Sequence, residues 1–122
     1  MIKSSERRNA IAEKSMAFAV RIVNLCRHLR RAKSEHVMSK QVLRSGTSIG
    51  ANVREAESAQ SKADFVSKMA IALKECGETS YWLELLVRTE YISKKEFSSI
   101  ATDCEELFAL LTAIVKTSRR EI

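Results

Sequence analysis

The chain has 122 residues, of which 45% are hydrophobic and 30% are charged, and its formal net charge is +6 at pH 7. This length suits one domain with a single modest core and excludes two independent domains. No run of about 18 apolar residues occurs, so no transmembrane helix is predicted. The opening MIKSSERRNAIAEKS lacks the apolar core of a signal peptide, and we therefore expect a cytoplasmic protein.

The chain contains no proline and only three glycines, a composition typical of helical proteins. Apolar residues recur at the spacing of one helical face in four segments, and no alternating strand pattern interrupts them. The predicted helices comprise residues 5–32, 36–59, 62–90 and 94–119. Because the connections between them are short, we predict that residues 1–122 form a single all-α domain, an antiparallel up-and-down four-helix bundle.

The first predicted helix ends in a basic cluster, CRHLRRAK, from Cys26 to Lys33. Residues 1–60 carry 12 Lys and Arg against 5 Asp and Glu, whereas residues 61–122 carry 9 against 10. Cations at a helix C-terminus interact favourably with the helix dipole and need no partner. The alternative is a basic surface that faces a polyanion such as nucleic acid.

The second helix runs through QVLRSGTSIGANVREA, which holds two of the three glycines. A phosphate-binding loop would follow a strand and carry set glycine offsets that are absent here. A flexible linker would not keep Val42, Ile49 and Val53 in helical register. Each internal glycine costs a helix about 1 kcal/mol relative to alanine. We therefore predict a helix in which small residues, Gly46 and Gly50 among them, allow a neighbouring helix to approach closely.

A band of polar side chains lies beside this apolar stripe. Its members step by three or four residues and are Gln41, Arg44, Ser48, Asn52 and Glu55. We predict that they satisfy one another or groups on an adjacent helix and so fix the register, with Arg44 pairing with Glu78 or Glu84. An interaction site is the alternative. A catalytic role is not predicted, since no base or nucleophile accompanies them.

The third and fourth helices begin with capping sequences, at Ser61 to Asp64 and at Ser93 to Glu96. The third helix carries apolar residues on more than one face, which favours burial against another chain, because no helix of a four-helix bundle is central. The apolar residues outside its main stripe are Val66, Ile71, Trp82, Leu85 and Leu86. For Tyr81 and Trp82 we expect packing, either within the bundle or across a subunit boundary.

The three cysteines fall on the apolar faces of three different helices. Cys26, Cys76 and Cys104 form no C-x-x-C pair, and only two histidines are present to complete a zinc site. We predict reduced, buried thiols with a structural role, and a disulfide or a metal site is the alternative. We expect no cofactor and no metal.

Two blocks of this sequence resemble a known family. The first is QVLRSGTSIGANVREA, and the second includes ETSYWLELLVRTEYI. The matching residues are Gln41, Arg44, Ser45, Thr47, Ser48, Ile49, Ala51, Asn52, Glu55, Phe65, Glu78, Thr79, Tyr81, Trp82, Leu83, Tyr91 and Ile92. The chain resembles, over nearly its whole length, the bacterial four-helix-bundle family called S23 or the 23S rRNA intervening-sequence protein family. Glu90 departs from the family's glycine before Tyr91, so that turn needs another cap.

The resemblance implies an up-and-down bundle that assembles as a ring-like homopentamer and has no settled biochemical activity. A distant structural relative of the family is a basic pentamer that binds nucleic acid and a reverse transcriptase. On this basis we expect a homopentamer here too.

The sequence as a whole favours a non-enzymatic, oligomeric protein that binds nucleic acid, structured RNA in particular, through basic patches. The candidate contacts of the first patch are Arg27, Arg30, Arg31 and Lys33, followed by Lys40 and Arg54. The candidate contacts of a second patch, at the opposite end, are Arg7, Arg8, Arg119 and Arg120. The alternative is a protein-interaction scaffold or accessory subunit that contacts a partner through Tyr81 and Trp82.

Overall fold

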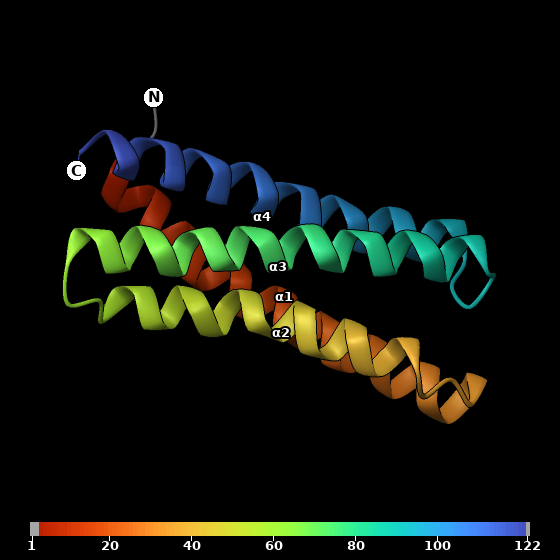
Figure 1. The fold of residues 1–122 in the computed structure, drawn as a ribbon. Helices are drawn as coiled ribbons and strands as arrows, with labels where there is room; N and C mark the ends of the chain where they lie inside the picture. Colours follow the sequence, from red (N-terminus) through yellow and green to blue (C-terminus); the bar gives the residue numbers. More distant parts are fainter. Residues whose placement is uncertain (1–2, 122) are drawn as a thin grey trace.

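The computed structural model describes residues 3–121 (Figure 1). The four helices are α1 Ser4–Lys33, α2 Met38–Glu57, α3 Lys62–Arg88 and α4 Lys94–Arg120. The all-α prediction is confirmed, since residues 3–121 contain no strand. Each helix begins and ends within two residues of its predicted bounds. The apolar periodicity therefore located the elements closely.

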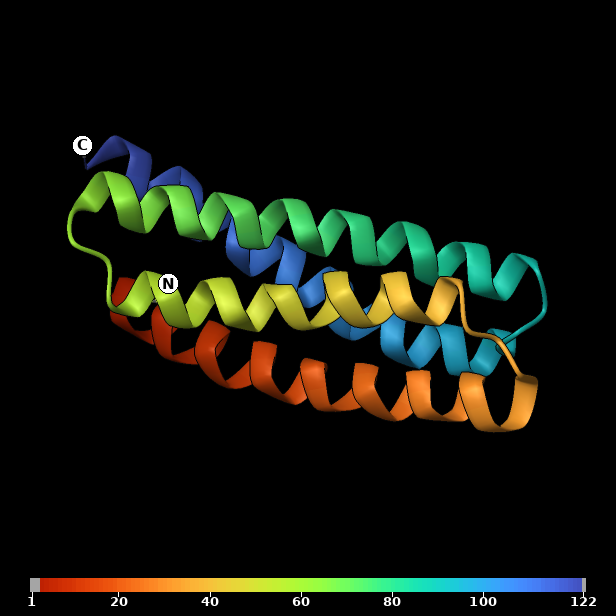
Figure 2. The ribbon, with the colours of Figure 1, turned by 60° about the horizontal axis from the view of Figure 1, so that its bottom comes forward.

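The helices form an up-and-down bundle in which successive helices run antiparallel (Figures 1 and 2). Helices α1 and α3 each pack on α2 and α4, and the diagonal pairs make no contact within the described part of the chain. The contact between α1 and α4 is the sparsest of the four. The three connections, residues 34–37, 58–61 and 89–93, are short. Both chain ends therefore lie at one end of the bundle (Figure 1).

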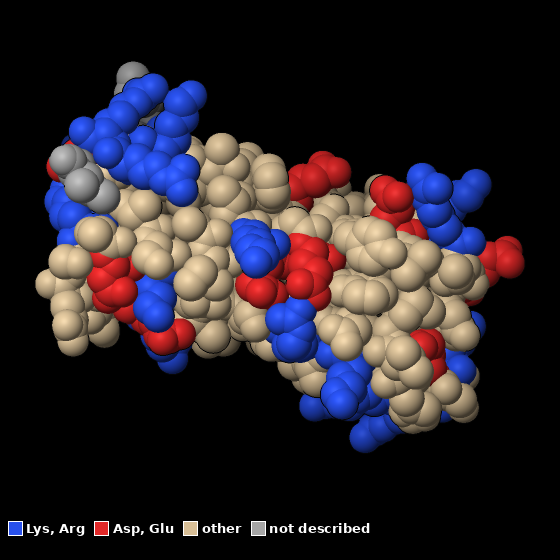
Figure 3. Space-filling view, in the orientation of Figure 1, with Lys and Arg blue, Asp and Glu red and all other residues tan. Residues whose placement is uncertain are grey.

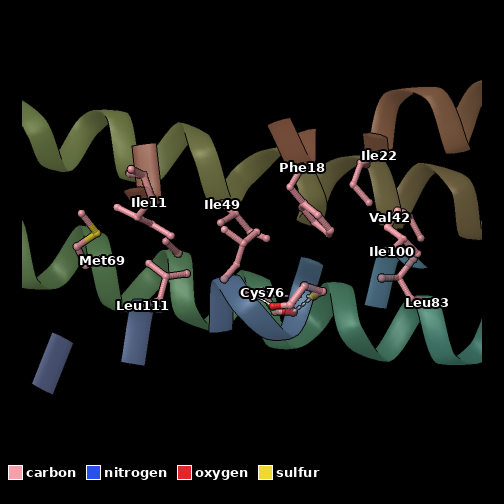
Figure 4. Close-up of a cluster of buried hydrophobic side chains, with 14 of the residues drawn as sticks. Ile11, Phe18, Ile22, Val42, Ile49, Met69, Cys76, Leu83, Ile100 and Leu111 are labelled. Atoms are coloured by element: carbon pink, nitrogen blue, oxygen red, sulfur yellow. Dashed lines mark hydrogen bonds between the residues drawn. The ribbon is translucent and has the colours of Figure 1, made fainter. Parts of the chain in front are cut away.

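Apolar side chains from all four helices form one core (Figure 4). Its largest fully buried members are Ile11, Phe18, Ile22, Leu29, Val42, Ile49, Met69, Val53, Leu83, Leu86, Leu107 and Leu111. Burying one such side chain stabilises the folded state by about 1.5–3 kcal/mol relative to leaving it exposed. The core therefore supplies the main driving force that holds the four helices together.

Helix α2 continues through the glycine-rich stretch, which confirms the prediction of a helix there. A Cβ atom at Gly46 would lie 2.8 Å from Cγ1 of Ile22 in α1, well inside the contact distance of two packed carbons. At Gly50 a Cβ atom would lie 3.4 Å from the carbonyl oxygen of Ser15, an ordinary contact. The close packing of α1 on α2 therefore requires a glycine at Gly46 but not at Gly50, and at Gly46 the packing offsets the poor helix propensity.

Local capping begins α3 and α4. In α4, Ser93 Oγ accepts a hydrogen bond from the Glu96 N–H, and Glu96 Oε1 accepts one from the Ser93 N–H, which confirms the predicted capping box. In α3, Ser61 Oγ accepts from the Asp64 N–H, but the Asp64 carboxylate accepts from the Gln60 N–H. The reciprocal bond of a full capping box is therefore absent from α3.

The turn after α3 closes with Glu90 in place of the glycine that the resemblance led us to expect. Glu90 itself adopts a φ of 65°, in the left-handed region. The Tyr91 N–H donates to the Leu86 carbonyl at 3.0 Å, which caps the end of the helix. A side chain in this conformation costs about 1–2 kcal/mol. With Glu90 at this position the turn therefore keeps its capping hydrogen bond, but the backbone of Glu90 is strained.

Candidate nucleic-acid interface

The bundle carries its positive charge at its two ends. We define the distal end as residues 27–40 and 84–99, the terminal end as residues 3–8, 54–68 and 116–121, and the waist as the helical residues between them. The distal end has 8 Lys and Arg against 4 Asp and Glu, the terminal end has 9 against 5, and the waist has 4 against 6. Figure 3 shows basic residues gathered at both ends of one face and mixed with acidic residues between them. The excess of positive charge in the first half of the sequence is therefore distributed over both ends of the folded bundle.

The distal end presents the predicted first patch on α1. Arg27 and Arg31 are exposed, and Arg30 is half-buried with its Nε donating to Ser39 Oγ at 3.3 Å. These three arginines border a shallow hollow of about 190 Å³ whose apolar floor includes Val23 and Leu43. Exposed guanidinium groups around an apolar floor are suited to a phosphate backbone with a base or sugar beside it.

One acidic residue of the distal end is occupied by a helix cap. Glu35 is 8% exposed, and its carboxylate accepts hydrogen bonds from the N–H groups of Val37, Met38 and Ser39, the last at 2.8 Å. Burial alone would raise the pKa of Glu35, but these bonds from the start of α2 hold the pKa below its ordinary value. Glu35 is therefore committed to capping α2. The nearby charge of Lys33, after the hydrogen bonds from Ser93, helps to lower the pKa of the Glu96 carboxyl, although the two side chains form no ion pair.

The terminal end brings together the residues predicted for the second patch. Arg7 of α1 donates to Thr117 Oγ1 of α4 at 3.4 Å, next to the exposed Arg119 and Arg120. The Arg8 guanidinium lies over the Phe65 ring, 4.2 Å from its centroid. The predicted approach of the N-terminus of α1 to the C-terminus of α4 is confirmed, although Arg7 and Arg8 are partly engaged by neighbours.

Arg54 lies at the terminal end of the bundle. The prediction had placed it in the first patch together with Lys40, which lies at the distal end. The two residues lie at opposite ends of α2, about 21 Å apart at the rise of an α-helix. Lys40 is exposed in the first turn of α2, close to Lys33 in the chain, and extends the distal patch. The grouping was wrong because it followed sequence order and not position along the helix.

Some basic residues are paired with carboxylates, and the candidate contacts are not. Six basic residues form the seven ion pairs within residues 3–121, and they are Lys14, Arg21, Arg44, Lys62, Lys68 and Arg88. None of the ten candidate contacts has a carboxylate oxygen within 4.0 Å in the described part of the chain. The candidate contacts at the two ends are therefore among the basic side chains without an ion pair in the described part of the chain, and Lys3, Lys74, Lys94, Lys95 and Lys116 are the others.

The polar band on α2 is a set of separate contacts. Arg44 pairs with Glu75 at 3.1 Å and with Glu78, whose other donor is Trp82 Nε1 at 3.2 Å. Arg44 beside Glu78 holds the pKa of that carboxyl below its usual range. The predicted pairing of Arg44 with Glu78 is confirmed. The alternative with Glu84 is wrong, because Glu84 pairs instead with Arg88 in the next turn of α3.

The remaining members of this band contact other groups. Ser48 Oγ and Asn52 Nδ2 donate to backbone carbonyl groups one turn earlier in α2, those of Arg44 and Ser48. Glu55 pairs with Lys68 at 3.6 Å. The prediction that the band satisfies its members mutually is therefore wrong for Ser48 and Asn52, whose polar atoms the helix backbone satisfies first.

The buried polar contact between α2 and α3 involves residues outside the band. Thr79 Oγ1 lies 3.0 Å from Ser45 Oγ, and both side chains are fully buried. Ser45 Oγ also lies 3.0 Å from the Gln41 carbonyl oxygen, to which it donates. Ser45 and Thr79 lie among the buried apolar residues of α2 and α3, and no contact between them was predicted. A hydroxyl on each of two facing stripes was the signal in the sequence.

Exposed apolar side chains occur on two sides of the bundle. On α1, Met16 and Val20 are 49% and 54% exposed, and Met16 borders a hollow of about 480 Å³ between α1 and α2 that is lined by small residues such as Ala12 and Gly50. On α3, Tyr81 is 60% exposed, and its ring meets that of half-buried Trp82 edge to face at 5.1 Å. The other apolar residues outside the main stripe of α3 differ in exposure. Val66 and Leu86 are buried, Leu85 is half-buried, and Ile71 is 40% exposed.

None of the four described helices combines the length and the hydrophobicity needed to cross a bilayer. No group of three or more His, Cys, Asp and Glu side chains is placed to hold a metal ion within residues 3–121. Fold and surface together define an all-α bundle with two basic ends and an acidic waist.

Comparison with known proteins identifies the family. The model of the family described as 23S rRNA-intervening sequence protein matches residues 7–113. A similar solved structure is that of a protein of unknown function from the S23 ribosomal protein family of Bacteroides thetaiotaomicron, with 59% sequence identity, a TM-score of 0.89, and coverage of 90% of this chain and 98% of that chain. No protein with a curated functional description matches. The chain belongs to the 23S rRNA-intervening sequence protein family, as the resemblance predicted.

Proposed function

We propose that this protein is a non-enzymatic homo-oligomer that binds structured RNA electrostatically through its basic ends. The observation that supports the proposal is that the ten candidate cations have no carboxylate partner within residues 3–121, whereas the basic residues in ion pairs are others. Phosphate groups are the external anions that an RNA supplies at regular spacing. Release of their counterions favours binding by several cations together.

Self-association multiplies this charge. The hollow between α1 and α2, with Met16 and Val20 beside it, differs from the exposed apolar surface of α3 at Ile71 and Tyr81. Two different surfaces on one chain support a head-to-tail contact, which closes into a ring when the rotation allows. The proposed number of copies is five, which the family resemblance implies. In such a ring the charge of +6 per chain is repeated in every copy.

Fluorescence anisotropy with a labelled hairpin RNA tests the RNA contact. The double variant Arg31→Gln/Lys33→Gln removes two exposed cations of the distal end without removing an ion pair. The control Lys14→Gln/Lys74→Gln lowers the net charge equally, from the waist. We expect the distal variant to weaken binding by about tenfold and the control by less than about threefold at the same salt concentration. Equal losses in the two variants would reject a localised interface.

A protein-interaction scaffold is the second candidate function. It is favoured by the exposed Tyr81 beside Trp82, since aromatic side chains of this kind dominate binding energy at many interfaces. Under this alternative the bundle would not bind the hairpin RNA at low salt, and the distal variant would match the parent protein in the anisotropy assay.

A further inference from the structure

Two of the three cysteines meet in the core between α3 and α4. Cys76 Sγ lies 3.8 Å from Cys104 Sγ, which is contact distance for two sulfur atoms. Each thiol also faces the other residue's backbone: Cys76 Sγ lies 3.3 Å from the Cys104 carbonyl oxygen, and Cys104 Sγ lies 3.6 Å from that of Cys76. Figure 4 shows Cys76 within the core cluster. All three thiols are free and buried, as predicted, and two of them form a pair.

This pair lies beside a hollow in the surface. Cys76 and Cys104 border a space of about 310 Å³ together with Gly77, Ser80 and Phe108. A Cβ atom at Gly77 would meet nothing closer than Cε2 of Phe108 at 3.9 Å, so packing within the chain does not require a glycine there. A mid-helix glycine lowers helix stability. Its effect here is to leave open the hollow beside the two buried cysteines, which a larger side chain would fill.

We propose that Cys76 and Cys104 are a redox-active dithiol that a small hydroperoxide oxidises to an interhelical disulfide. The sulfur atoms must approach from 3.8 Å to about 2 Å, and rotation of two side chains beside an open hollow supplies that movement. The cross-link would join α3 to α4 and close the chain segment that contains the connection at residues 89–93.

The chemistry proceeds in two steps. The Cys104 thiol loses its proton, and the thiolate attacks one oxygen of the hydroperoxide. The O–O bond breaks, and the departing oxygen takes up a proton and leaves as an alcohol (water in the case of hydrogen peroxide), with a sulfenic acid on Cys104. The Cys76 sulfur then attacks the Cys104 sulfur as its thiol loses its proton, the S–O bond breaks, and the departing hydroxide takes up a proton and leaves as water. Two thiols are oxidised and one hydroperoxide is reduced by two electrons, so no further reactant is needed.

The contact between the thiols sets the order of attack. Either sulfur can donate in this contact; with Cys76 as the donor, the hydrogen bond lowers the pKa of the Cys104 thiol and raises that of Cys76. Cys26 is the internal comparison, because it is buried without a second sulfur, and burial raises its pKa to about 11. Its Sγ donates to the Ser39 carbonyl oxygen at 3.3 Å. Cys26 is therefore expected to stay reduced under conditions that oxidise the pair.

Intact-mass and non-reducing peptide mapping after treatment of the native protein with hydrogen peroxide tests the proposal. We expect the loss of two hydrogen atoms per chain, a linked peptide pair containing Cys76 and Cys104, and reversal by dithiothreitol. The Cys26→Ser variant should react like the parent. The Cys76→Ser variant should not form the linked pair. A Gly77→Leu variant, which keeps both sulfurs and fills the hollow, should react at least about tenfold more slowly while its circular dichroism stays helical.

Three results would overturn the proposal. The first is that all three thiols remain open to alkylation after treatment. The second is that Cys26 is oxidised as fast as the pair, and the third is that the linked peptides come from different chains. Unchanged reaction of Gly77→Leu would reject the hollow as the route of access. None of these readouts depends on RNA binding.

Discussion

Two glycines, one in α2 and one in α3, give a matched test of the packing. Both Gly46→Ala and Gly77→Ala gain about 1 kcal/mol of helix propensity. At Gly77 the new Cβ lies 3.9 Å from Phe108, an ordinary contact, so the gain is kept. At Gly46 the new Cβ lies 2.8 Å and 2.9 Å from two carbons of Ile22, which is fully buried and restricted by its β-branch. Overpacking of this kind costs about 1–3 kcal/mol.

The expected outcome is a difference in sign between the two variants. We expect Gly77→Ala to raise the free energy of unfolding by about 1 kcal/mol and Gly46→Ala to lower it by up to about 2 kcal/mol. For a chain of this length these changes correspond to roughly 4 °C in Tm per kcal/mol. Thermal unfolding followed by circular dichroism, at one fixed protein concentration, measures both. Equal shifts in the same direction would refute the claim that Gly46 is required by the approach of α1.

The remaining predictions concern helix ends and pH. Glu35→Ala should lower the free energy of unfolding by about 1–2 kcal/mol in urea titrations, because three N–H groups of α2 lose their acceptor, whereas Glu84→Ala, which removes an exposed ion pair, should change it by less than about 1 kcal/mol. Glu90→Gly should raise the free energy of unfolding by about 1 kcal/mol, and with it Tm, because glycine adopts the left-handed backbone conformation without strain. An unchanged or lower Tm would contradict the strain at Glu90. Hydrogen bonds from Arg44 and from the Ser93 N–H hold the pKa of Glu78 and of Glu96 below the unfolded value of about 4.3, so their stabilisation is present above that pH and is lost as pH falls through the folded values. Tm should therefore be flat from about pH 7 to 5 and fall below about pH 4, and a Tm that rose on acidification would reject these assignments.

Periodicity was a sufficient guide to the helices because each stripe is a property of one segment. The same argument explains why α2 was predicted through its glycines: Val42, Ile49 and Val53 keep one register, and all three are buried. The position of one helix along its neighbour is a different property, and it cannot be predicted from the apolar pattern of one segment. The choice between Glu78 and Glu84 as the partner of Arg44 therefore required the position of α3 beside α2.

The start of α2 shows a second limit of sequence patterns. Ser34, the first residue of the connection between α1 and α2, takes a φ of 52° as the C-cap of α1. Glu35 then supplies the acceptor for α2 from within the connection. Because four residues must end one helix and begin the next, the cap is decided by the backbone path and not by residue preference. The pairing of Cys76 with Cys104 likewise required the positions of two helices.

The salt dependence of RNA affinity tests the central claim most directly. If the five candidate contacts of the distal end, Arg27, Arg30, Arg31, Lys33 and Lys40, bind phosphates, a plot of log K against log salt for the hairpin RNA should have a slope of about −3 to −5, or steeper if several copies bind one RNA. The Arg31→Gln/Lys33→Gln variant should reduce this slope by about 1–2, and the waist control should leave it unchanged. A slope near zero, or the same slope for both variants, would contradict an electrostatic RNA interface at the basic ends.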